Sequence, residues 1–167
     1  KWAAIEGTSI IAGDYEDKLK TILSEDIINE AKSLSSKISV VKEGIIASEY
    51  GATATHDATE GGILGAVWEV AECSKVGVEI YADEIPVLEC TKEICKAAKI
   101  DYLRLISSGT LIMTAFDGEK LVDKLKSEGI NAAVIGRVTD SGRYVTFNGI
   151  RKELVPQEKD EIYRVDL

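Results

Sequence analysis

One short segment of the sequence contains the residue types that phosphate chemistry requires, the run HDATEGG at residues 56–62. It follows a predicted strand and precedes a predicted helix, so backbone N–H groups and the positive end of the helix dipole would face a ligand there. The paired glycines let a ligand approach the backbone closely. The segment is therefore a candidate anion or phosphate cradle, with five candidate ligand-binding residues: His56, Asp57, Thr59, Gly61 and Gly62.

Two side chains in this segment add chemistry of their own. Asp57 is the type of residue that holds Mg²⁺, which proteins bind through one or two carboxylates together with substrate phosphates. His56 is the only histidine in the chain and can transfer a proton near neutral pH. The alternative interpretation is structural: Asp57 or Thr59 caps the helix, the glycines form the turn, and His56 is a hydrogen-bonded residue at a strand end.

A second candidate is the polar loop formed by Ser107, Ser108, Gly109 and Thr110, which directly precedes an apolar run. Hydroxyl groups beside a glycine can hydrogen-bond a phosphate or a nucleotide ring. The chain has no GxSxG elbow and no second histidine to activate a serine, which argues against a Ser-His-Asp hydrolase. The alternative is an ordinary turn that leads into a strand.

Motifs that would indicate independent chemistry are missing from the sequence. It contains no GxxxxGKS/T, GxGxxG or HExxH motif, and therefore no stand-alone nucleotide or zinc signature. The three cysteines, Cys73, Cys90 and Cys95, include no CxxC pair, which favours reduced structural thiols over disulfides or a zinc site. We therefore expect no metal on this domain alone, and any phosphate chemistry would depend on another domain.

The composition narrows the classes of protein and of partner. The chain has 167 residues with 20 basic and 29 acidic side chains and a formal net charge of −9, which argues against nucleic-acid and anionic-membrane partners. Apolar residues make up 45%, enough for one globular domain with an appended arm. No apolar run reaches the roughly 18 residues that span a bilayer, and no signal peptide opens the chain. We therefore expect a cytoplasmic protein, and the initial Lys1 indicates a fragment of a longer one.

Residues 1–50 are expected to form a linker strand followed by helices that lead into the domain core. Residues 8–12 form a predicted strand that ends at Gly13, and Asp14 is the predicted N-cap of a charged helix that continues to Leu23. Ser24 restarts a helix whose apolar residues repeat with the 3.6-residue period. A third helix is predicted over residues 40–50.

From residue 51 to residue 150, the predicted core, the sequence alternates between strands and helices. Predicted strands cover residues 52–55, 77–81, 111–116, 130–138 and 143–147, and predicted helices cover residues 62–74, 87–98 and 118–127. Residues 140–142 are expected to join the last two strands as a hairpin. This order contains two strand-helix-strand units and indicates an α/β sandwich related to the ferredoxin-like arrangement. Residues 151–167 are strongly charged and are expected to form a docked or partly disordered tail.

Several groups of residues resemble one known family in their order and spacing. They are residues 56–62, 64–72, 77–80, 85–87, 101–111 (DYLRLISSGTL) and 133–138 (AVIGRV). The resemblance is to the C-terminal domain of the AIR synthase (PurM) superfamily, and within it to AIR synthase-related proteins similar to the hydrogenase maturation factor HypE. It covers most of the chain from Gly7 onward.

This resemblance implies a three-layer α/β/α sandwich with a mixed sheet, partly ferredoxin-like, as one domain of a two-domain ATP-dependent enzyme. Such an enzyme activates a substrate oxygen by phosphorylation. ATP and Mg²⁺ would bind with the help of the protein's own N-terminal domain, which would also form a homodimer, and the isolated C-terminal domain would be inactive. In this chain the resemblance places Asp57, Thr59, Gly61 and Gly62 on the phosphate side of the cleft. It makes residues 107–110 a second wall around a small-molecule substrate.

Two departures separate this chain from HypE itself. HypE ends in a cysteine that accepts a carbamoyl group, whereas this chain ends in Val165, Asp166 and Leu167. Glu60 stands where HypE-like sequences carry Arg, so an anion replaces a phosphate-binding cation. The alternative function is a non-catalytic maturation or assembly module that binds a partner protein, because the acidic surface and the charged tail suit a basic partner.

Overall fold

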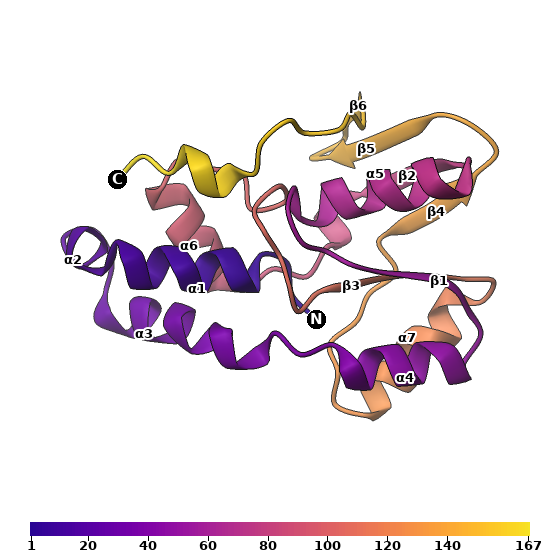
Figure 1. Cartoon of the computed structure of the whole chain (residues 1–167), viewed down its shortest axis with the longest axis horizontal. Coiled ribbons are helices and arrows are strands. Elements are labelled where there is room, and N and C mark those ends of the chain that lie inside the picture. Colours follow the sequence, from indigo (N-terminus) through magenta and orange to yellow (C-terminus); the bar gives the residue numbers. More distant parts are fainter.

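The computed structural model describes residues 1–167 and has a mixed α/β fold (Figure 1). The α-helices are α1 (Ile5–Asp14), α2 (Glu16–Leu19), α3 (Glu25–Ser33), α4 (Val41–Glu49), α5 (Gly62–Ser74), α6 (Glu89–Ala97) and α7 (Gly118–Ser127). The strands are β1 (Ala52–Asp57), β2 (Gly77–Tyr81), β3 (Leu111–Ala115), β4 (Gly136–Thr139), β5 (Arg143–Phe147) and β6 (Ile150–Glu153). Short 3-10 helices are η1 (Leu34–Lys37), η2 (Ala82–Glu84) and η3 (Glu161–Arg164). None of the helices has the length and apolar character needed to cross a membrane.

The predicted elements are confirmed where the sequence has clear helix and turn signals. α5, β2 and α7 have the predicted bounds. Asp117 caps α7 by accepting the N–H of Lys120 at 3.1 Å, and Gly129 follows the helix with a φ of 76°. Ser24 accepts the N–H of Ile27 at 3.5 Å at the start of α3. Caps and glycine stops therefore determine these helix boundaries locally.

The strands form two sheets instead of the single mixed sheet that the resemblance implies. β1 and β3 form an antiparallel pair, and the other sheet has the order β4-β2-β5-β6. The predicted hairpin between β4 and β5 is wrong, because β2 lies between them, antiparallel to β4 and parallel to β5. The observed hairpin joins β5 to β6, where Asn148 and Gly149 have φ values of 50° and 75°, typical of a two-residue type I′ turn. β4 is also shorter than predicted, since residues 130–135 form no strand.

The N-terminal strand predicted at residues 8–12 is wrong, because these residues lie within α1. This helix packs against α3 and α6 (Figure 1), and its buried residues are Ile5, Gly7, Thr8, Ile11 and Ala12. A Cβ on Gly7 would overlap the side chain of Leu105, so the glycine permits close packing here. Helix packing thus overrides the strand preference of the β-branched residues. The charged helix predicted to start after Asp14 is reduced to the four residues of α2.

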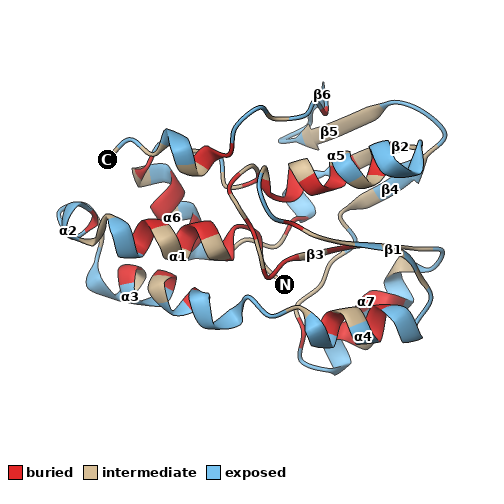
Figure 2. Cartoon of the chain, in the orientation of Figure 1, coloured by how far each residue is buried: buried red, intermediate tan, exposed pale blue.

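The apolar side chains form two large cores and one small one. Figure 2 shows buried residues along the inward faces of α1, α5 and α6. One core lies between α5 and the strands and includes Ile63, Leu64, Val67, Val78, Ile80 and Leu154. A second joins α1, α3 and α6 and includes Ile11, Ile28, Ile94 and Leu105. The third is a cluster of Ile46, Leu121, Leu125 and Ile130 between α4 and α7.

The C-terminal residues are anchored to the rest of the chain at several buried or partly buried positions. Leu154 is only 1% exposed in the core beneath α5. Asp160 and Glu161 are buried, and Ile162 and Val165 pack against the helical core. Of the two alternatives for the charged tail, the structure therefore has the docked one.

Candidate functional site

The two loops singled out in the sequence lie next to each other in the structure. β1 and β3 pair so that Asp57 is opposite Leu111. The N–H of Ala58 then donates to the carbonyl oxygen of Thr110 at 2.9 Å. The strand pairing therefore brings residues 57–62 beside residues 107–110, as a single ligand site would require.

The paired glycines are required by the backbone of the first loop. Gly61 and Gly62 have φ values of 78° and 62°, in the left-handed region that favours glycine. A Cβ on Gly62 would lie 2.7 Å from the carbonyl oxygens of both Leu103 and Leu105. The protein's own backbone thus fills the space beside Gly62, and of the two glycines only Gly61 lines a pocket.

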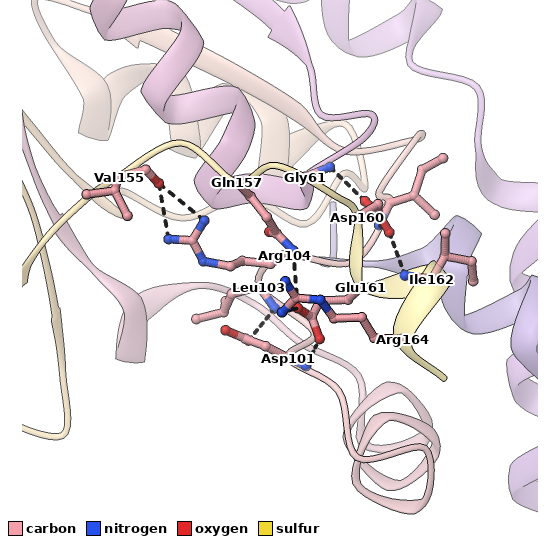
Figure 3. A network of polar contacts seen from close by, with 11 residues as sticks. Gly61, Asp101, Leu103, Arg104, Val155, Gln157, Asp160, Glu161, Ile162 and Arg164 are labelled. Carbon is pink, nitrogen blue, oxygen red and sulfur yellow. Dashed lines mark hydrogen bonds and ion pairs between the residues drawn. The ribbon is translucent and has the colours of Figure 1, made fainter. Parts of the chain in front are cut away.

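At the start of α5, the backbone N–H groups of Gly61 and Gly62 already donate hydrogen bonds to other groups of the protein. The N–H of Gly61 donates to Oδ2 of Asp160 at 2.7 Å (Figure 3). The N–H of Gly62 donates to the carbonyl oxygen of Thr59 at 3.1 Å. Neither Asp57 nor Thr59 caps the helix through its side chain, so the capping alternative is wrong.

The Asp160 carboxylate is an internal anion at the positive end of α5. Its Oδ1 accepts the N–H groups of Ile106 at 3.2 Å and Ile162 at 2.8 Å, in addition to the Gly61 bond on Oδ2. The residue is 4% exposed. The fold therefore places its own carboxylate where the sequence predicts an external anion.

Asp57 holds the one polar atom of the first loop that is buried without a partner. Its Oδ1 makes no hydrogen bond. A buried carboxylate oxygen without a donor is costly, and a hard cation such as Mg²⁺ would satisfy it. Asp57 therefore fits the role of a Mg²⁺ ligand. No group of three or more ligating side chains surrounds it, so the remaining ligands would have to come from a nucleotide, water or another polypeptide.

His56 pairs with a residue that the sequence analysis did not select. Its Nε2 lies 2.7 Å from Oε2 of Glu69 on α5, and both side chains are partly exposed. The contact fixes the orientation of the imidazole ring by giving its Nε2 atom a carboxylate hydrogen-bond partner. Thr59 and Glu60 are exposed on the same loop.

The second loop holds the N-terminal residues in place. The Ser107 hydroxyl accepts the N–H of Ala4 at 2.7 Å and lies 2.9 Å from Oγ1 of Thr110. Thr110 Oγ1 donates to the carbonyl oxygen of Trp2 at 2.7 Å, so Ser107 must donate to Thr110. The N–H of Ser108 donates to Glu6 at 3.1 Å. Ser107, Gly109 and Thr110 are buried, which leaves Ser108 as the residue of this loop nearest to solvent.

A pocket of about 270 Å³ lies over the first turns of α5. One wall is formed by the loop and α5, through Glu60, Gly61, Gly65, Trp68 and Glu69, and the other by the tail, through residues 156–160 and Tyr163. Four carboxylates and one ammonium group, that of Lys159, line it. A bare phosphate would be repelled, whereas Mg²⁺ held between carboxylates and phosphates would relieve the repulsion.

Sequence reasoning missed Asp160, Trp68 and Tyr163 as parts of this pocket. Asp160 lies 99 residues from Gly61 in the chain, within a charged segment that has no motif. No local signal indicates such a contact. A larger hollow of about 760 Å³ lies between the two sheets, but its lining is mostly apolar and brings together none of the polar groups described above except the Thr110 region.

The sequence pattern of one family matches most of the chain. The family is described as "AIR synthase related protein, C-terminal domain", and the match covers residues 4–147. This chain belongs to that family.

Curated proteins similar to this AIR synthase-related chain include a putative hydrogenase expression/formation protein and a carbamoyl dehydratase. A putative hydrogenase expression/formation protein of Methanocaldococcus jannaschii is 29% identical over 154 residues, which cover 87% of this chain and 46% of that protein. Carbamoyl dehydratase HypE of Azotobacter vinelandii is 29% identical over 148 residues, covering 81% of this chain and 42% of that protein. The chain therefore spans less than half the length of these relatives.

Solved structures of the same group share the fold. HypE from E. coli, a hydrogenase maturation protein, has a TM-score of 0.65 and 25% identity over 75% of this chain and 42% of that one. A HypE–HypF complex gives a TM-score of 0.59 and 28% identity over 67% of this chain and 39% of that one. AaThiL in complex with AMPPCP and TMP gives a TM-score of 0.67 over 94% of this chain and 48% of that one, and at 18% identity this likeness concerns the fold alone.

Proposed function

We propose that this AIR synthase-related chain is the C-terminal part of an ATP-dependent, HypE-like enzyme that activates a substrate oxygen by phosphorylation. The observation that carries the proposal is the buried, unpartnered Oδ1 of Asp57 at the end of β1. Family membership supports it, since relatives include carbamoyl dehydratase HypE. The isolated chain is then inactive, because it spans less than half of its relatives and ATP would need a further domain.

In this proposal each residue of the first loop has a separate task. Asp57 would supply one carboxylate ligand to Mg²⁺, and the bound ion would neutralise the phosphates of ATP. Gly61 borders the pocket through backbone alone, so it has no side chain of its own that would obstruct a ligand. His56, held by Glu69, would accept or return a proton at the edge of the site.

The remaining components of the active site would come from outside this chain. The other Mg²⁺ ligands and the dimer contacts are assigned to an N-terminal domain of the same protein, which forms a homodimer. The small-molecule substrate would bind in the cleft between the domains.

The test is the substitution Asp57→Asn in the protein that carries this chain with its N-terminal domain. We expect ATP turnover to fall at least about 100-fold, as for removal of a metal-orienting group, with an unchanged melting temperature. Asp140→Asn, which changes an exposed carboxylate in the turn before β5, is the matched control and should leave turnover unchanged. Full activity in Asp57→Asn would contradict the proposed role.

A second candidate function is a maturation or assembly module without turnover of its own. It is favoured by the HypE–HypF complex, in which a similar chain is crystallised with a partner protein, and by the net charge of −9. Stable capture of a purified maturation protein without any ATP hydrolysis would support it. Binding that requires ATP turnover would favour the enzyme instead.

A further inference from the structure

The tail segment of residues 155–160, here called the strap, lies across the first turns of α5 and forms one wall of the pocket (Figure 3). We propose that the strap is an autoinhibitory gate, in which the Asp160 carboxylate occupies the position of a ligand phosphate and must leave Gly61 before the phosphate binds. This inference rests on the proposed function, because it concerns the same loop.

The central contact of the strap is that of an anion in an anion site. The Asp160 carboxylate is 4% exposed and accepts three backbone N–H groups, two of them from outside the tail, Gly61 and Ile106. Backbone donors at a helix N-terminus are the groups that bind phosphate in proteins. A ligand phosphate and Asp160 therefore compete for the same donor.

The strap is anchored at both ends, and several of its residues between the anchors face solvent. Leu154 before it is buried in the core, and Ile162 after it packs on the helical core. Between these anchors Pro156, Glu158 and Lys159 are exposed. Opening therefore requires a short segment to move, while the apolar anchors stay in place.

The closed strap makes several hydrogen bonds but also leaves one buried polar atom without a partner. The Arg104 guanidinium donates two hydrogen bonds of 3.3 Å to the carbonyl oxygen of Val155. Nε2 of Gln157 donates to Glu161 at 3.1 Å, but its Oε1 is buried without a partner. An unpaired buried acceptor destabilises the closed position, and opening the strap would expose it to water.

The negative charge of the pocket determines which kind of ligand favours opening of the strap. With the strap closed, Asp160 adds a carboxylate to those of Glu60, Glu69 and Glu158. Displacing it removes one negative charge and frees one donor at the same time. Opening therefore favours binding of a phosphate with Mg²⁺ in two ways, through weaker charge repulsion and an additional hydrogen-bond donor, whereas it favours a neutral ligand little.

The test measures binding of ATP with Mg²⁺, by calorimetry, to the protein that carries this chain with its N-terminal domain. Asp160→Asn keeps the shape of the side chain and removes its charge, so it should bind about tenfold more tightly than the unmodified protein. The control is Glu153→Gln on β6. It removes the same charge from an exposed residue outside the pocket, and this variant should bind as the unmodified protein does.

The outcomes separate the gate from the function. Tighter binding by Asp160→Asn alone supports the gate. Equal or weaker binding by a folded Asp160→Asn protein, with clear binding by the unmodified one, overturns the gate and leaves the proposed function intact. No binding by any of the proteins overturns both.

A second measurement covers the case in which Asp160→Asn does not fold. Amide hydrogen exchange in residues 155–161 of the unmodified protein should become faster when ATP with Mg²⁺ is bound, because the strap leaves Gly61. Slower or unchanged exchange in this segment on binding would overturn the gate.

Discussion

The Asp160 carboxylate lies 2.7 Å from the backbone nitrogen of Gly61, although 99 residues separate them in the chain. This contact makes the C-terminal segment and the loop before α5 one structural unit. It also means that the predicted anion cradle is already occupied by an anion of the protein itself. The stability of the tail and the availability of the site are therefore linked.

Replacing Asp160 by Ala should destabilise the fold by about 3 kcal/mol, since it leaves buried backbone donors unpaired at a helix N-terminus. Asp160→Asn keeps an acceptor and should cost about 1 kcal/mol. Urea unfolding of the chain measures both. The exposed substitution Glu153→Gln should stay within about 0.5 kcal/mol of the unmodified chain, and an equally small effect for Asp160→Ala would show that the contact contributes nothing.

Gly62→Ala should cost about 4 kcal/mol or prevent folding, because the new Cβ would lie 2.7 Å from two backbone carbonyl oxygens at a φ of 62°. Gly149→Ala is the matched comparison, since its φ is 75° but no atom lies within 4 Å of the new Cβ. It should cost about 1 kcal/mol, the strain of the left-handed backbone alone. Thermal unfolding of both variants checks the difference, and equal costs would contradict the packing account.

These glycines illustrate which parts of the fold were predictable. The turn before α5, the cap Asp117 and the stop at Gly129 are local signals, and the elements they delimit are confirmed. The strand predicted at residues 8–12 failed because packing of α1 against α3 and α6 outweighs local propensity. The predicted hairpin between β4 and β5 failed because β2 inserts between them, which no turn signal reveals.

The candidate site was also predictable only in part, because local sequence does not reveal contacts between separate elements. The loop at residues 56–62 and its position between strand and helix follow from local sequence. The contact of Asp160 with Gly61 joins residues 99 positions apart, and that of Glu69 with His56 joins a helix to a strand across the loop between them. The roles of Asp57 and its neighbours toward a nucleotide stay predictions.

Glu16 should make the stability of the fold sensitive to acid. Hydrogen bonds from Lys20 and then Lys32 lower the pKa of Glu16 from 4.5 to about 2. The unfolded chain therefore binds more protons between these values, so the stabilisation is complete above about pH 4.5 and is lost as the pH falls toward about 2. Melting temperatures across this range should fall less steeply in Glu16→Gln. Glu25→Gln, which removes an exposed carboxylate without an ion pair, should keep the steep profile, and identical profiles for all three proteins would contradict the account.

The three thiols should differ sharply in reactivity. Cys73 is exposed, whereas Cys90 and Cys95 are buried. Burial raises the pKa of both buried thiols, that of Cys95 to about 12, so they are neutral and shielded. Ellman's reagent should titrate one thiol per folded chain rapidly and all three in denaturant. Rapid reaction of more than one thiol in the folded chain would show that the helical core is open.

The most direct test of the central claim is a calorimetric titration of ATP with Mg²⁺ into two proteins: the 167-residue chain alone, and the protein in which it is joined to its N-terminal domain. The account predicts saturable, Mg²⁺-dependent binding to the second and none to the first, since Asp57 supplies only part of the metal site. Absence of binding to both would contradict an ATP-dependent function.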